Sequence, residues 1–155
     1  MGVRSYENEQ FAFTADFWAT IVLSGLIAGV LMGVVMYLVM GIMQSVAGLY
    51  TLESTIAGWA AHLANSVIFA LAFGVAFAWP PFDQYRTEVL SSMSLGIIWG
   101  VVLWLFAAGI VMPAWLGAVG PASPPVPAIN PISGLGHILY GAALGSVFAA
   151  LQSRY

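Results

Sequence analysis

Four long apolar segments, none of which contains a charged residue, constrain the fold of this chain more than any other feature. They run from about residue 17 to 43, from 56 to 79, from 89 to 111 and from 132 to 151. A helix of about 20 apolar residues spans the hydrocarbon core of a bilayer. The sequence therefore predicts an all-α fold, a four-transmembrane-helix bundle that forms a single integral membrane domain over residues 1–155.

The segments between these helices are polar or rich in proline. Residues 1–16 contain four charged side chains and form a polar arm, and the Pro-Pro pair at 80–81 ends the second helix. Residues 113–131 hold six of the eight prolines and no charge. We expect this last segment to be an ordered loop on the membrane surface.

The three arginines predict the orientation of the chain. Arg4, Arg86 and Arg154 fall in the first arm, in the link between the second and third helices, and in the C-terminal tail, which all lie on one side of the membrane. Positively charged residues favour the cytoplasmic side. We therefore expect a multi-pass cell-membrane protein with both termini in the cytoplasm, and with residues 113–131 outside.

Several classes of function are disfavoured by composition. Only 6% of the residues are charged, lysine is absent, and a basic surface for nucleic acid cannot form. Cysteine is also absent, which excludes disulfides and thiolate ligands. No paired carboxylates, serine elbow or phosphate-binding loop is present, so we do not expect an enzyme. The expected partners are the lipid bilayer and either further copies of the chain or a larger membrane complex.

The chain contains a weak internal repeat. The glycine-rich segment 25–30 matches 96–101 at an offset of 71, and the surroundings of His62 match those of His137 at an offset of 75. Each half would then be a pair of helices. The repeat predicts two pseudo-repeated helix pairs related by an axis along the membrane normal.

Glycines at i, i+4 spacing predict where helices approach each other. They form three sets, namely Gly25, Gly29 and Gly33; Gly96 and Gly100; and Gly141 and Gly145. Because lipid supplies no hydrophobic drive for helix association, helices in membranes associate through close contacts of this kind. We expect these sets to build a tight bundle or a dimer face.

The polar residues inside the spans cluster around the two histidines. His62, Asn65 and Ser66 share one face of the second helix, and His137 and Tyr140 share one face of the fourth. Polar side chains within a membrane usually face the protein interior. We expect both faces to meet in one buried cluster, at one depth in the outer half of the bundle. In one interpretation, neutral histidines bond to Asn65, Ser66, Tyr140 or each other and only lock the helices.

A second interpretation makes the histidines ligands of a cofactor. Two imidazoles on separate helices of a bundle are typical axial ligands of haem b, and Asn65, Ser66 and Tyr140 would surround that site. The outer side, however, offers no Arg or Lys for the haem propionates.

Copper is a variant of this interpretation. The thioethers of Met40, Met43 and Met112 would join His62 and His137, because soft ligands suit Cu(I). A stripe of methionines is more often simple core. Zinc fits less well, since Glu53 is the only carboxylate nearby.

One segment resembles a known type of protein. Residues 137–145, His-Ile-Leu-Tyr-Gly-Ala-Ala-Leu-Gly, are similar to the His-x-x-Tyr-Gly-x-x-x-Gly segment of small uncharacterised four-helix membrane proteins of archaea and bacteria. The resemblance implies the four-span topology and singles out His137. It implies no activity, and the segment at His62 departs from it, with Asn65 and Ser66 in place of Tyr and Gly.

Taken together, these features favour a non-enzymatic small subunit or helper of a membrane complex, with a buried polar centre at His62 and His137. Two alternatives stay open. One is an electron-transfer subunit that binds haem b or copper, and the other is a transporter of a small solute or metal.

Overall fold

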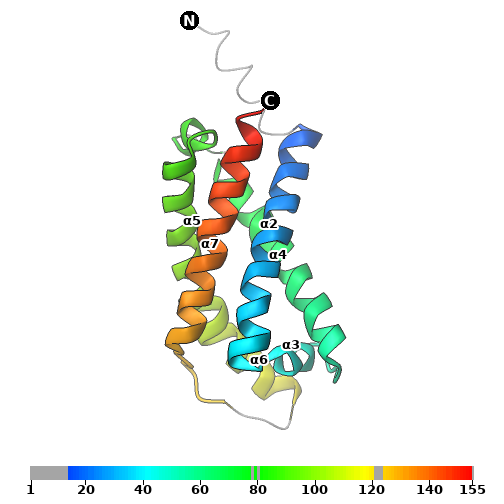
Figure 1. Ribbon diagram of the computed structural model, residues 1–155. Helices are drawn as coiled ribbons and strands as arrows, with labels where there is room; N and C mark the ends of the chain where they lie inside the picture. Colours follow the sequence, from blue (N-terminus) through cyan, green and yellow to red (C-terminus); the bar gives the residue numbers. More distant parts are fainter. Residues whose placement is uncertain (1–13, 78, 80, 121–123, 155) are drawn as a thin grey trace, which may run out of the picture.

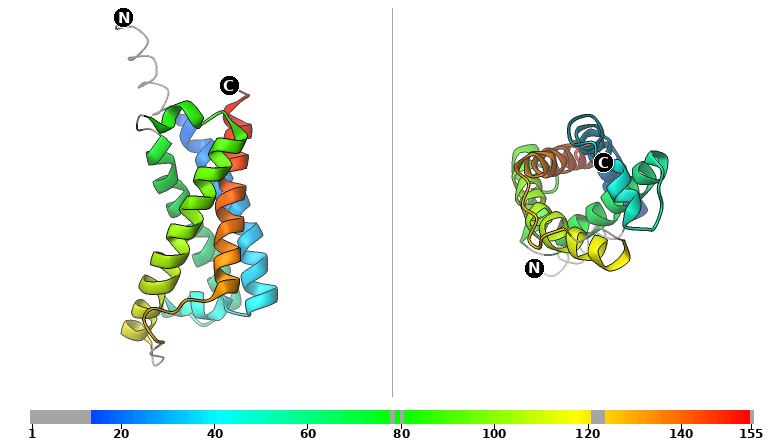
Figure 2. Two further views of the ribbon diagram at one scale, coloured as in Figure 1. Left: turned by 90° about the vertical axis from the view of Figure 1, so that its left-hand side faces the viewer. Right: turned by 90° about the horizontal axis from the view of Figure 1, so that it is seen from below.

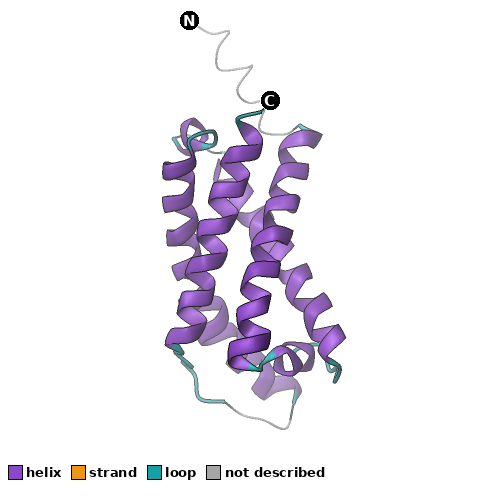
Figure 3. Cartoon of the chain, viewed as in Figure 1, coloured by secondary structure: helices purple, strands orange, loops and turns teal. Residues whose placement is uncertain are grey.

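The computed structural model describes residues 14–77, 79, 81–120 and 124–154, and all regular structure in these ranges is helical. Its elements are α2 (Ala15–Val35), η1 (Met36–Met40), α3 (Met43–Gly48), α4 (Thr55–Phe77), η2 (Phe82–Tyr85), α5 (Val89–Leu103), η3 (Trp104–Val111), α6 (Met112–Val119) and α7 (Pro131–Gln152) (Figure 3). Residues 1–13 of the expected polar arm lie outside the described residues.

Four helical stretches are long and apolar enough to cross a membrane. They are Ala15–Met40, Thr55–Phe77, Val89–Val119 and Pro131–Gln152. Large apolar side chains point outward from them; Ile98, for example, is 61% exposed and Ile68 58%. Extended apolar surface of this kind suits contact with lipid. The predicted all-α fold with four apolar spans is confirmed.

Two of the long helices end differently from the expectation. The first, expected to reach residue 43, finishes in the π-helical η1 because Gly41 adopts a left-handed conformation (φ 65°) that glycine tolerates without strain. The Gly41 N–H bonds back to the Met36 carbonyl, and the separate short helix α3 follows. The segment 113–131, expected as a loop, begins inside the helix α6.

The long helices run up and down around a common centre (Figures 1 and 2). The described ends of the chain lie together at one end of the bundle, the terminal end, whereas α3 and α6 lie at the other, the α3/α6 end (Figure 1). Helix α2 packs along α4 and α7, and α5 packs along α7. Helices α4 and α5 have no extended backbone contact within the described residues, and we call the space between them the α4/α5 seam.

The glycine sets hold these pairs together. Between α5 and α7, a Cβ at Gly96 would overlap the backbone carbonyl of Gly141, and a Cβ at Gly100 would overlap that of His137. Gly29 on α2 similarly leaves room for Ser66 of α4. The predicted close approach through glycine is confirmed, and it occurs between helices of one chain.

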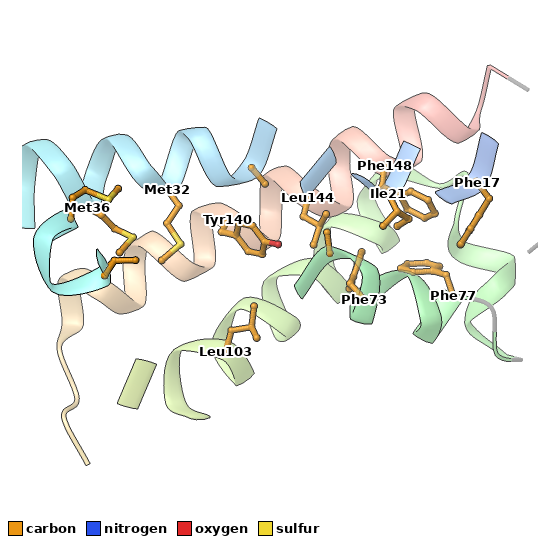
Figure 4. Close-up of a cluster of buried hydrophobic side chains, with 14 residues drawn as sticks. Phe17, Ile21, Met32, Met36, Phe73, Phe77, Leu103, Tyr140, Leu144 and Phe148 are labelled. Atoms are coloured by element: carbon orange, nitrogen blue, oxygen red, sulfur yellow. The ribbon is translucent and has the colours of Figure 1, made fainter. Parts of the chain in front are cut away.

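An aromatic cluster fills the terminal half of the bundle. Phe17 of α2, Phe77 of α4 and Phe148 of α7 are each almost fully buried, and Phe148 lies 5.5 Å from Phe17 and 5.2 Å from Phe77, measured between ring centroids. Ile21 and Leu144 complete this cluster (Figure 4). Edge-to-face and tilted ring contacts of this kind are favourable. The cavity that contains the two histidines lies in the other half of the bundle.

Candidate ligand cavity between the helices

A cavity of about 160 Å³ lies toward the α3/α6 end, with all four long helices in its wall. Methionine, leucine, alanine and aromatic side chains make up most of its lining. The polar residues singled out in the sequence, His62, Asn65, Ser66, His137 and Tyr140, all line this one cavity. The structure therefore brings the two polar helix faces together.

His62 reaches across to the backbone of α2. Its side chain is 7% exposed, and its Nε2 lies 2.9 Å from the Gly29 carbonyl oxygen. Gly33 leaves room for the neighbouring Trp59 ring, which a Cβ there would overlap, and such a Cβ would also lie 3.1 Å from the His62 Cδ2. A carbonyl can only accept, so Nε2 carries the proton of the neutral imidazole and Nδ1 keeps its lone pair.

His137 bonds within its own helix. Its side chain is 8% exposed, and its Nδ1 lies 2.8 Å from the Ser133 carbonyl one turn earlier in α7. By the same reasoning Nδ1 donates to this carbonyl, and the Ser133 hydroxyl oxygen, 3.4 Å away, can accept from the same N–H. Nε2, on the other side of the ring, keeps its lone pair.

The lone-pair nitrogens of both histidines lack a protein partner among the described residues. In that part of the chain, the Ser92 hydroxyl is the only fully enclosed side-chain polar atom without a hydrogen bond. The His62 Nδ1 and the His137 Nε2 are therefore not sealed by protein atoms. Both residues line the cavity, and each ring has one nitrogen that no described residue bonds to.

The remaining polar side chains bond mainly to the protein. The Tyr140 hydroxyl donates to the Ser66 carbonyl at 2.6 Å and ties α7 to α4. The Ser66 hydroxyl donates to the His62 carbonyl at 2.8 Å, and the Asn65 Oδ1 accepts from the Tyr50 hydroxyl at 2.7 Å. The expected partners of the histidines are wrong, because both rings bond to backbone carbonyls, but the His62 bond to Gly29 still locks α4 to α2.

The methionines around the cavity differ from the expected set. Met112 lines the cavity together with the histidines, whereas Met40 and Met43 do not. Met43 lies in α3, after the chain has turned at Gly41, and its side chain is buried. Of the helical stripe Met36, Met40 and Met43, only Met36 lines the cavity, and Met32, one turn earlier, lines it as well. Figure 4 shows the side chains of Met32 and Met36. The described residues contain no group of three His, Cys, Asp or Glu that could hold a metal ion.

The size of the cavity argues against haem. An engineered protein cavity of about 150 Å³ holds one benzene molecule, and the space here is about 160 Å³. A haem macrocycle joins four pyrrole rings in one plane and does not fit in that volume. The structure therefore gives no support to the bis-histidine haem site that the sequence pattern suggested.

Short helices cover the cavity at the α3/α6 end. Tyr50, just after α3, and Trp115 of α6 both line it, and their ring centroids lie 5.9 Å apart. The Tyr50 bond to Asn65 fixes this cover to α4. The sequence analysis missed Tyr50, because only the turn at Gly41 brings it back over the helix ends.

The α4/α5 seam is bridged by one hydrogen bond. The Trp99 Nε1 of α5 donates to the Phe69 carbonyl of α4 at 3.2 Å. Phe69 lines the first cavity, and Trp99 lines a second, nearly apolar cavity of about 130 Å³ in the same seam. The seam is thus loosely packed on both sides of this bridge. Trp99 was visible in the sequence only as one more aromatic residue in an apolar run.

Comparison of the chain with protein-family models, curated proteins and solved structures found no match. The fold and the cavity define the class of molecule. It is a helical bundle with four helices able to cross a membrane, which enclose a largely apolar cavity with two histidines in its wall.

Proposed function

We propose that this protein is a membrane-embedded binding protein for a small lipid-soluble molecule, and that it acts as a non-enzymatic subunit or helper of a membrane complex. The cavity between the four helices carries this proposal. Binding sites for small molecules are typically concave, mostly apolar and equipped with a few polar groups. The space of about 160 Å³, with its two histidines, has this character on the scale of a single aromatic ring.

The surroundings of the cavity favour access from the bilayer. The aromatic cluster of Phe17, Phe77 and Phe148 fills the terminal half, and Tyr50 and Trp115 cover the opposite end. The α4/α5 seam has the least backbone contact, and its helices carry exposed apolar side chains. A ligand dissolved in lipid would enter along this seam.

We also propose that the two halves are pseudo-symmetric about an axis along the membrane normal. Both halves have the same order of elements, namely a long helix, a π-helical segment, a short helix and a second long helix with a histidine in its first turns. In this arrangement the α2/α7 contact is the counterpart of the α4/α5 seam. The first pair is closely packed and the second is not, so the cavity opens where the halves differ.

A thermal-shift experiment with a filled-cavity variant tests the binding proposal. Benzene should raise the melting temperature of the purified protein in mild detergent, because a ligand at ten times its Kd stabilises a fold by roughly 1.4 kcal/mol. Ala107 lines the cavity, and Ala107→Phe should remove the response by occupying the space. The matched control is Ala150→Phe, since Ala150 is exposed and lies outside the cavity.

Benzene also partitions into detergent, and the comparison between the variants separates this effect from binding. If the parent shows no shift, or if Ala107→Phe and Ala150→Phe respond as the parent does, the cavity is not a binding site.

A further inference from the structure

We propose that the cavity selects a ligand with hydroxyl groups on an aromatic ring, such as the headgroup of a phenol or a quinol, because its two buried histidines face it as acceptors. This inference rests on the binding function proposed above. It starts from the hydrogen-bond arrangement of the two rings, which differ in geometry but leave the same kind of group free.

Both imidazoles have already used their proton on a backbone carbonyl. The His62 Nε2 donates to Gly29 and the His137 Nδ1 donates to Ser133. Each side chain is more than nine-tenths buried. What remains free on each ring is an acceptor, so a ligand can satisfy these nitrogens only by donating.

The other polar side chains around the cavity sharpen this preference. The hydroxyl protons of Tyr140 and Ser66 are donated to backbone carbonyls, and are not available to a ligand. Asn65 has its Oδ1 occupied by Tyr50, and its amide Nδ2 can still donate. A hydroxyl group can donate to an imidazole and accept from this amide at the same time. A carbonyl or an ether oxygen can only accept, and would leave the imidazoles unpaired.

The shape of the site favours an aromatic ring. The cavity of about 160 Å³ matches the space that holds benzene in an engineered protein. The two histidines come from different helices, α4 and α7, and in our proposal the two hydroxyl groups of a quinol ring bond to one histidine each. Any apolar tail on the ring would leave along the α4/α5 seam, beside the second apolar cavity.

A soft metal ion is the competing occupant. Imidazole ligands of metals usually donate their second N–H to a carbonyl or carboxylate, and thioethers favour Cu(I). Both features occur here, with Met32, Met36 and Met112 in the lining. However, the ligand atoms of a metal ion all lie about 2 Å from one point. Side chains arranged in that way would fill the space, whereas here they surround a cavity of about 160 Å³.

Four probes of similar shape test the preference without any mutation. They are p-xylene, 1,4-dimethoxybenzene, phenol and hydroquinone, titrated into the protein in lipid nanodiscs by calorimetry. We expect hydroquinone to bind about 10-fold or more tightly than p-xylene. Phenol should have an intermediate affinity, and 1,4-dimethoxybenzene should bind no more tightly than p-xylene.

Two variants test whether the higher affinity for hydroquinone depends on the histidines. His137→Phe and His62→Phe keep a ring but remove the acceptor, so each should lower hydroquinone affinity and leave p-xylene binding in place. Ser92→Ala is the matched control, because Ser92 is buried and polar but lies outside the cavity. Its affinities should equal those of the parent.

Each alternative result has a distinct meaning. Binding of p-xylene without a hydroquinone advantage overturns the hydroxyl preference and leaves the binding function standing. Failure of all four probes overturns the binding function itself. Stoichiometric Cu(I) binding that both histidine variants abolish, together with no hydroquinone advantage, assigns the lone pairs to a metal and overturns the proposal.

Discussion

Gly141 and Gly136 lie on the same helix, α7, and alanine should have opposite effects at the two positions. A Cβ at Gly141 would overlap the backbone carbonyl of Gly96 and lie 3.1 Å from the amide nitrogen of Gly100. A Cβ at Gly136 would meet only the side chains of Met32 and Val35, with the nearest atom 3.7 Å away. The first position lies in a backbone contact between helices, and the second lies beside a flexible side chain.

The magnitudes follow from these contacts. Both replacements gain about 1 kcal/mol of intrinsic helix propensity, which cancels when the two variants are compared. Extra methyl groups in a packed interior cost about 1 to 3 kcal/mol. The upper part of that range applies to Gly141, because α5 must move away from α7 as a unit to make room for the methyl group. A gap of about 1 Å between the helices forfeits a quarter to a half of the energy of each dispersion contact across it. We expect G141A to lose about 1 to 2 kcal/mol of stability, and G136A to gain up to about 1 kcal/mol.

Unfolding in mixed micelles of a mild detergent and SDS, followed by the helical circular dichroism signal, measures the difference. The two variants carry the same chemical change on one helix, so detergent effects on alanine are shared. Equal unfolding curves for G141A and G136A would refute the packing of α5 against α7 described here. A G141A variant as stable as the parent would do so as well.

Two further predictions concern the orientation of the chain and the start of α7. A reporter fused after Arg154 should read cytoplasmic and one inserted after Gly120 should read external; the opposite pattern reverses the orientation inferred from the arginines. Asn130 caps α7 by accepting from the Ile132 and Ser133 N–H groups, so Asn130→Ala should cost about 0.5 to 2 kcal/mol in the same unfolding assay, while Asn130→Ser should retain most of the stability. If alanine and serine behave alike at this position, the cap does not stabilise the bundle.

The methionines show where inference from sequence spacing stops. Met36, Met40 and Met43 follow one another at helical intervals, and a continuous helix would place them on one face. The left-handed Gly41 ends that helix, so Met43 belongs to a separate element and only Met36 of the three reaches the cavity. A glycine near the end of a predicted helix is a known stop signal, so Gly41 was the residue in the sequence that could have indicated the end of the first helix.

The sequence by itself determined the properties that depend on local chemistry. Uncharged apolar runs specify membrane-spanning helices, because a backbone in lipid must satisfy its own hydrogen bonds. Polar side chains at i, i+3 and i+4 share one face, and that face avoids lipid. Glycines at i, i+4 permit close helix contact. For these reasons the fold class, and the five polar residues His62, Asn65, Ser66, His137 and Tyr140 of the cavity wall, could be predicted without coordinates.

Only the tertiary structure decided which atoms meet. The Gly29 carbonyl that accepts from His62 is 33 residues away in the sequence, and the partner of Tyr140 is 74 residues away. Helical periodicity gives the face of a residue, but not the distance or rotation of the neighbouring helix. The free lone pairs of His62 and His137, the loosely packed α4/α5 seam and the volume of the cavity all depend on that placement, and so does the chemistry of any ligand.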